Sequence, residues 1–147
     1  MKKTVKIISL VVLALIIFVG GYFSGSVNSN EVSREILIGY NDNENPSRVN
    51  FPVTFNDREN QSIIDNMLMI YLHKEKTENG NIEAENPDIY IKVSSPKQSV
   101  GLIDSKVWFL KNGAVIGLRT GDSWDNVEYY EIDESETDYI KGIIDYQ

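Results

Sequence analysis

The sequence predicts an α+β protein in which one apolar N-terminal helix precedes a small, mostly antiparallel sheet packed by one long helix and a short C-terminal helix. Three observations predict this fold. The chain opens with an apolar run, short stretches rich in β-branched and aromatic residues alternate with turn signals, and two later segments show helical spacing of apolar residues. The length of 147 residues fits about one domain beyond the apolar run.

The first thirty residues differ in charge from the rest of the chain. They contain three lysines and no acid, whereas all 22 acidic residues lie from Glu31 onward. The apolar run from Ile7 to Phe23, as a helix, spans roughly 25 Å, against a hydrocarbon core of about 30 Å. Because lysines gather on the cytoplasmic side of a membrane span, we expect a cytoplasmic N-terminus and an outer C-terminal part in a single-pass protein of the cell membrane.

This charge pattern divides the chain into four segments: residues 1–6 as the cytoplasmic N-terminus, 7–23 as a transmembrane signal anchor, 24–32 as a flexible tether, and 33–147 as an extracytoplasmic domain. The lipid bilayer is then the first expected partner, contacted through Ile7–Phe23. A cleaved signal peptide is the alternative, because small residues around Ser26 form a cleavage site whose use would secrete the domain.

The first half of the domain begins with two expected strands. Residues 34–40 combine β-branched and aromatic side chains and end at a turn-rich run, 41–47. Residues 51–55 alternate apolar and other positions and read as a strand. Because Pro52 has no N–H to donate to a neighbouring strand, we expect this strand at the edge of the sheet.

A helix is expected near 57–73. Asn56 is suited to cap its N-terminus, and Glu59, three residues later, is suited to reach back to the capping amide. One helical face then carries apolar side chains at spacings of one, three and four: Ile63, Ile64, Met67, Leu68 and Tyr71.

The second half reads as a series of strands and turns. Residues 77–87 form a polar loop, 94–101 a turn and crossing, and Asn112-Gly113 a tight hairpin because these residues accept positive φ. The expected strands are 88–93, 105–110, 114–118 and 127–132.

The C-terminal helix has a second capping box. Asp133 and Glu136 stand three residues apart before a short apolar stripe that includes Ile140. Gly142 weakens this helix by about 1 kcal/mol relative to alanine.

Three motifs follow one another in this order: Pro87-Asp88-Ile89-Tyr90-Ile91, Lys106-Val107-Trp108-Phe109, and Tyr130-Glu131-Ile132 with Asp133 to Thr137. With them, residues 55–147 resemble the YhfM-like small extracytoplasmic domains of Gram-positive bacteria. The resemblance implies an α+β fold and a tethered location outside the cell, and it implies no known activity. Such domains carry a lipoprotein or transmembrane anchor, and this chain has no cysteine for lipid attachment.

Composition removes several function classes. Without cysteine there is no disulfide, thiolate zinc site or cysteine nucleophile, and His73 is the only imidazole. A net charge of −8 argues against nucleic-acid binding. A hydrolase that uses two carboxylates is a less favoured alternative, because 22 acidic residues produce pairs by chance.

The acidic run near the C-terminus raises a calcium site as a minor alternative. Asp122, Asp125 and Glu128 are the best ligand candidates, because a turn followed by a strand can point them together. The run lacks the calcium-loop pattern, so a solvated acidic face is the preferred interpretation, with no metal and no cofactor.

Four aromatic residues on expected strands form a candidate binding surface: Trp108, Phe109, Tyr129 and Tyr130. Strand alternation sends the members of each adjacent pair to opposite faces, so one of each pair is expected in the core. The outward members would face a ligand or an extracytoplasmic protein partner.

The preferred function is a membrane-anchored extracytoplasmic binding or regulatory domain without enzymatic activity. A structural or envelope-stress accessory protein is the alternative. The sequence names neither a ligand nor a pathway.

Overall fold

The computed structural model describes residues 2–28, 31–42, 44–45, 48–78, 82–83 and 85–146. The chain forms two compact units, Met1–Glu31 and Val32–Gln147. The first unit is the helix α1 (Lys2–Asn28). Its segment Val5–Gly25, of 21 residues with a mean hydropathy of 2.5, is long and apolar enough to cross a membrane. The expected apolar N-terminal helix is therefore present.

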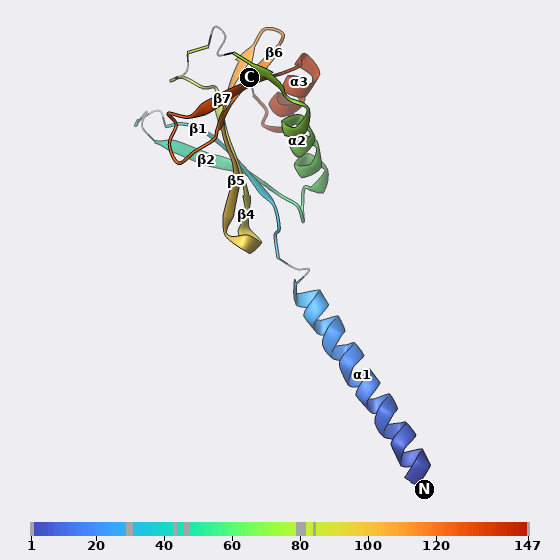
Figure 1. Ribbon diagram of the computed structural model, residues 1–147. Helices are drawn as coiled ribbons and strands as arrows, with labels where there is room; N and C mark the ends of the chain where they lie inside the picture. Colours follow the sequence, from blue (N-terminus) through green and yellow to red (C-terminus); the bar gives the residue numbers. More distant parts are fainter. Residues whose placement is uncertain are drawn as a thin grey trace. The chain divides into compact units, whose positions relative to one another are not determined.

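The second unit is an α+β domain, as predicted (Figure 1). Its strands are β1 (Glu35–Asn41), β2 (Val49–Asn56), β3 (Glu75–Thr77), β4 (Ile89–Ser95), β5 (Val100–Leu110), β6 (Gly113–Arg119) and β7 (Val127–Ile132). They form one sheet in the order β2-β1-β4-β5-β6-β7-β3, and every neighbouring pair is antiparallel. The helices are α2 (Gln61–His73) and α3 (Glu134–Ile143), and a 3₁₀ turn η1 (Pro96–Gln98) joins β4 to β5.

Both helices pack on the same face of the sheet (Figure 1). Every second residue of the central strands points toward them, which is the two-residue period of a strand with one buried face. The core joins Ile64, Met67, Ile70 and Tyr71 of α2 and Ile140 of α3 to the strand residues Ile36, Ile38, Ile89, Ile91, Val93, Val107, Ala114, Ile116 and Ile132.

Two local predictions are confirmed. β2, with Pro52, lies at the edge of the sheet. The second capping box is complete, because the Glu136 N–H donates to Asp133 Oδ1 at 2.8 Å and the Asp133 N–H donates to Glu136 Oε2 at 3.3 Å.

The predicted start of the long helix is wrong by four residues. Asn56 Oδ1 accepts from the N–H groups of Arg58 and Glu59, both at 3.1 Å, so this cap organises a separate turn. Asn60 then leaves helical geometry, with φ −132° and ψ 42°, and α2 begins at Gln61. The turn is held instead to the chain just before β1, because the Asp57 N–H donates to the carbonyl of Arg34 at 3.1 Å.

Three predictions about connections are also corrected. Residues 75–77 form the short edge strand β3 against β7, at a place where the sequence predicts no strand. Residues 94–101 make a direct hairpin between β4 and β5 and no crossing. In the β5–β6 hairpin, Leu110 pairs with Gly113, and of the Asn-Gly pair only Gly113 has positive φ, at 133°.

Candidate binding face of the sheet

The face of the sheet opposite α2 and α3 is not covered by either helix. The register places Leu37, Lys92 and Asp104 side by side across β1, β4 and β5. The next row across the sheet consists of Gly39, Tyr90, Lys106, Gly117 and Tyr129. We call this side of the sheet the open face.

The central strands with their turns are basic although the protein is acidic. Residues 89–121, which form β4, β5 and β6, contain five basic residues and one acidic residue, a net charge of +4. The remainder of the unit from 32 to 147 contains six basic and 20 acidic residues, a net charge of −14. Three of the five cations, Lys92, Lys106 and Arg119, lie on or beside the open face.

Each of these three cations lies over an aromatic ring. Lys92 Nζ is 4.8 Å from the ring centre of Phe51, and Lys106 Nζ is 4.7 Å from that of Trp124. The Arg119 guanidinium carbon lies 5.7 Å from the same Trp124 ring. Such contacts stabilise a cation without neutralising it. In the part of the chain that the structure describes, neither Lys92 nor Lys106 forms an ion pair.

Two glycines let aromatic rings approach the backbone of the sheet closely. A Cβ atom at Gly39 would stand 2.7 Å from Cδ1 of Phe51, and one at Gly117 would stand 2.9 Å from Cζ3 of Trp108. Any larger residue would therefore displace the ring. The sequence shows these glycines only as interruptions of strand patterns, which is a general mark of close approach.

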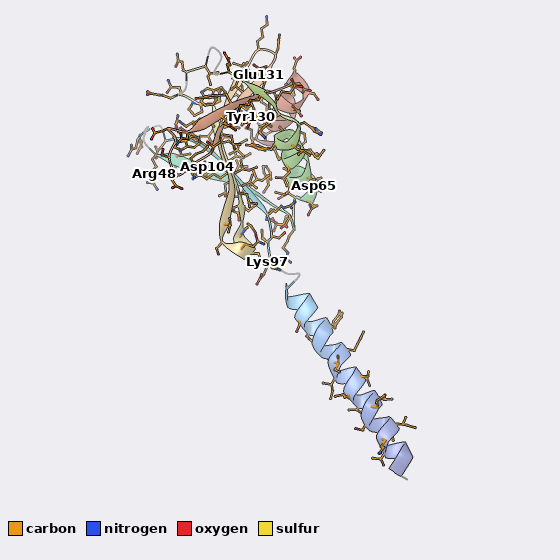
Figure 2. All side chains as sticks on the ribbon, viewed as in Figure 1. Arg48, Asp65, Lys97, Asp104, Tyr130 and Glu131 are labelled. Carbon is orange, nitrogen blue, oxygen red and sulfur yellow. The ribbon has the colours of Figure 1, made fainter. Side chains whose placement is uncertain are left out.

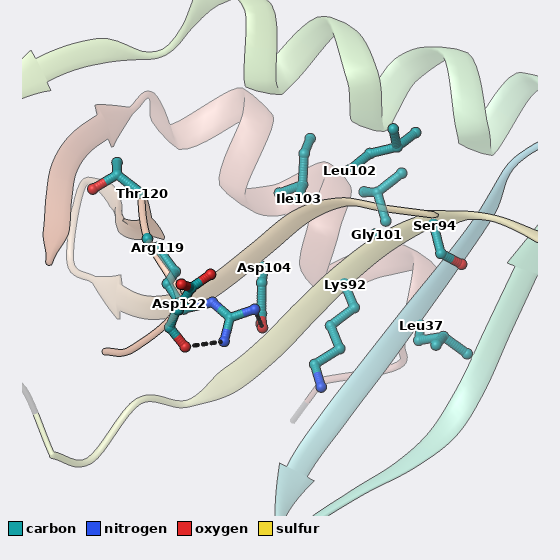
Figure 3. Close-up of a pocket in the computed structure, with 12 residues that line it drawn as sticks. Leu37, Lys92, Ser94, Gly101, Leu102, Ile103, Asp104, Arg119, Thr120 and Asp122 are labelled. Atoms are coloured by element: carbon teal, nitrogen blue, oxygen red, sulfur yellow. Dashed lines mark hydrogen bonds and ion pairs between the residues drawn. The ribbon is translucent and has the colours of Figure 1, made fainter. Parts of the chain in front are cut away.

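A hollow of about 540 Å³ lies on the open face toward the β4–β5 hairpin (Figure 3). Its lining includes Leu37, Lys92, Leu102, Asp104, Arg119 and Asp122. Figure 3 shows the charged side chains of β4, β5 and β6 gathered on the same side of the strands.

The carboxylate of Asp104 lies in the lining of this hollow. Asp104 Oδ2 accepts from Arg119 Nη2 at 2.9 Å, and the other oxygen, Oδ1, is buried with no hydrogen-bond partner among the described residues.

The four aromatic candidates do not form one surface. As expected, Trp108 and Tyr129 lie on the open face, whereas Phe109 and Tyr130 lie on the helix-covered face. Trp108, however, is only 4 % exposed, because its indole donates to the Glu83 carbonyl at 2.9 Å beneath the loop before β4. Trp108 is therefore a buried residue although it points away from the two helices.

The other three rings have local partners. The ring of Tyr129 lies beside Trp108, with centroids 6.1 Å apart, and Phe109 packs edge to face on Tyr146 at 4.7 Å. Tyr130 lies under Lys74 Nζ at 4.3 Å and donates to Glu128 at 2.7 Å. These contacts make Phe109 part of the packing around α3 and place Tyr130 beside Lys74, the C-cap residue of α2.

The calcium candidates have separate partners. Asp125 accepts from the Ser123 hydroxyl at 2.8 Å, and Glu128 forms an ion pair with Lys76 at 2.8 Å. Asp122 is exposed in the loop before β7, and its carbonyl faces Arg119 at 3.5 Å. Within the described ranges, no three residues among His, Asp and Glu are placed to hold a metal ion.

The residues that characterise the open face were missed as candidates: Phe51, Tyr90, Lys92, Asp104, Lys106, Arg119 and Trp124. One signal was available in the sequence, since Asp104 is the only acid between Asp88 and Asp122. The aromatic contacts were not visible, because Phe51 and Trp124 come from distant segments. Figure 2 places Asp104 within the sheet domain, away from the labelled residues of α2 and β7.

Comparison with models of protein families, with curated proteins and with solved structures finds no match for this chain. The resemblance of residues 55–147 to YhfM-like domains therefore stays a prediction.

Proposed function

We propose that this protein is a membrane-tethered binding domain whose open face takes an anionic ligand. One observation carries the proposal: in an acidic domain, Lys92 and Lys106 stand on the face that neither helix covers. Each is held by an aromatic ring, and neither is paired with a carboxylate of the described residues. Arg119 is fixed beside them by Asp104. Cations that are positioned but not neutralised favour a negatively charged ligand.

The proposal assigns the protein a binding role and no catalytic step. A carboxyl group that acts as a general acid needs a raised pKa, and three carboxylates of this domain show the opposite shift. Hydrogen bonds from the backbone of Glu44 and from Lys76, respectively, lower the pKa values of Asp42 and Glu128. Asp57 also has a lowered pKa, because its hydrogen bonds from Ser33 and Arg34 outweigh partial burial, which alone would raise it.

We further propose the topology that the charges favour. The lysines before the apolar helix would stay in the cytoplasm, and the sheet domain would lie outside. Protease added to intact protoplasts should then remove the domain from the membrane fraction. A C-terminus that stays protected would contradict this orientation, and a mature chain that begins near Val27 would favour secretion after cleavage.

The binding proposal is tested with the full chain in nonionic detergent and inorganic triphosphate as the probe. Trp124 lies against Lys106 and Arg119, so binding should change its fluorescence, whereas the buried Trp108 serves as an internal reference. Lys92→Gln and Lys106→Gln should each weaken binding about tenfold, because a hydrogen bond to a charged group contributes about 1.5 kcal/mol.

Lys111→Gln is the matched control, since Lys111 belongs to the same basic segment but lies in the exposed β5–β6 turn. It should leave the affinity nearly unchanged. Equal losses in all three variants would show that only net charge matters. A wild-type chain that does not bind triphosphate would favour the structural accessory role instead.

A further inference from the structure

The β4–β5 hairpin lies at the end of the sheet where the chain enters the domain. Glu35, the first residue of β1, pairs with Ser94 on one side and with Asn56 on the other. Beyond Ser94 the hairpin continues through η1 to Val100. Within the domain, its tip, which Figure 2 marks by Lys97, therefore projects past the point where β1 begins.

The surface of this hairpin combines apolar and basic character. Val100 is 48 % exposed and Leu102 is 51 % exposed, although both belong to a strand. From residue 89 to residue 103 the chain has two lysines, Lys92 and Lys97, and no acidic residue. Exposed apolar side chains beside lysines are typical of a surface that lies in the interface of an anionic membrane.

Only a short piece of chain separates the apolar helix from the first residue that is attached to the domain. The carboxylate of Asp57 accepts hydrogen bonds from the N–H groups of Ser33 and Arg34 at 3.1 Å, which attaches the chain to the domain from Ser33 onward. The candidate span ends at Gly25. Because α1 continues to Asn28, the five residue steps from there to Ser33 span at most about 18 Å.

We propose that the tip of the β4–β5 hairpin is a second membrane contact, with Val100 and Leu102 in the interface of an anionic bilayer. This inference rests on the proposed membrane anchor, since the occupant is the bilayer that holds the chain's own apolar helix. Lys97 would lie among the headgroups, and the contact would hold the domain at the membrane surface. Each lysine near such a surface strengthens the contact by about fivefold.

The experiment uses the absence of cysteine from the chain. Leu102→Cys supplies a single thiol for a polarity-sensitive fluorophore, in the full chain reconstituted into nanodiscs. Leu110→Cys is the matched control, because Leu110 is 44 % exposed and lies at the opposite end of the same strand. The nanodiscs contain phosphatidylcholine with or without phosphatidylglycerol, and each composition includes a nitroxide-labelled lipid as the quencher.

We expect lipid quenching of the label at residue 102 and none at residue 110, with stronger quenching when phosphatidylglycerol is present. Equal quenching at both positions, or none at 102 in chains that remain in the bilayer, would overturn the inference. A blue-shifted label at 102 that lipid does not quench would indicate contact with a second protein copy and would also overturn it. Chains that leave the bilayer altogether would instead contradict the proposed anchor.

Discussion

A buried hydrogen-bonded pair joins the long helix to the centre of the sheet. The hydroxyl oxygens of Tyr71 in α2 and Ser105 in β5 are 2.5 Å apart, and Ser105 donates to the carbonyl of Ile91 at 3.1 Å. Because the one hydroxyl proton of Ser105 goes to Ile91, Tyr71 is the donor of the shorter bond. Tyr71 is 5 % exposed, and burial raises the pKa of its phenol well above the usual range.

The two single substitutions should differ in cost. Ser105→Ala leaves the phenol of Tyr71 buried without an acceptor, which should lower the free energy of unfolding by about 1–3 kcal/mol. Tyr71→Phe removes one hydrogen bond but leaves Ser105 bonded to Ile91, so the loss should be about 0.5–1.5 kcal/mol. The double variant has no orphaned phenol and should cost less than the sum of the two.

The wild type, the two single variants and the double variant form a double-mutant cycle. Their free energies of unfolding are measured by urea unfolding of the full chain in nonionic detergent. Both tryptophans, Trp108 and Trp124, lie in the sheet domain, so their fluorescence reports its unfolding and not that of the apolar helix. A Tyr71→Phe variant that is less stable than Ser105→Ala, or strictly additive losses, would refute the assigned direction of the hydrogen bond.

Two further predictions concern packing and pH. Gly117→Ala should destabilise the domain by about 1–3 kcal/mol, because its Cβ would stand 2.9 Å from the buried ring of Trp108. Gly142→Ala, whose Cβ would have no atom within 4 Å, should stabilise the domain by about 1 kcal/mol in the same urea assay. Equal effects of the two substitutions would contradict the close approach at Gly117. Burial and a hydrogen bond to Asp88 raise the pKa of Tyr146 to about 12, so this contact contributes stability below pH 10 and loses it as the pH rises toward 12. The fall of the thermal midpoint over this range should be smaller in Tyr146→Phe than in the wild type, with the remainder due to other buried tyrosines such as Tyr71.

The sequence determined the parts of the fold that depend on local chemistry. The apolar run of the N-terminus, the edge position that Pro52 dictates, and the capping box of Asp133 and Glu136 were each predictable, because the relevant partners stand within a few residues. Strand alternation likewise predicted that Trp108 and Phe109 face opposite sides of the sheet. The charge contrast along residues 89–121 was also present in the sequence.

The tertiary structure decided which of these residues remain accessible. Asn56 has the chemistry of a helix cap, yet the contacts of Asp57 with the chain before β1 leave it capping a separate turn. Trp108 is buried beneath the segment that contains Glu83, whose carbonyl accepts a hydrogen bond from the indole. Lys106 gains an aromatic partner, Trp124, only when the loop before β7 folds over the sheet. These contacts join segments that are distant in sequence. Such tertiary contacts override the local helix and strand propensities, which are all that a single sequence displays.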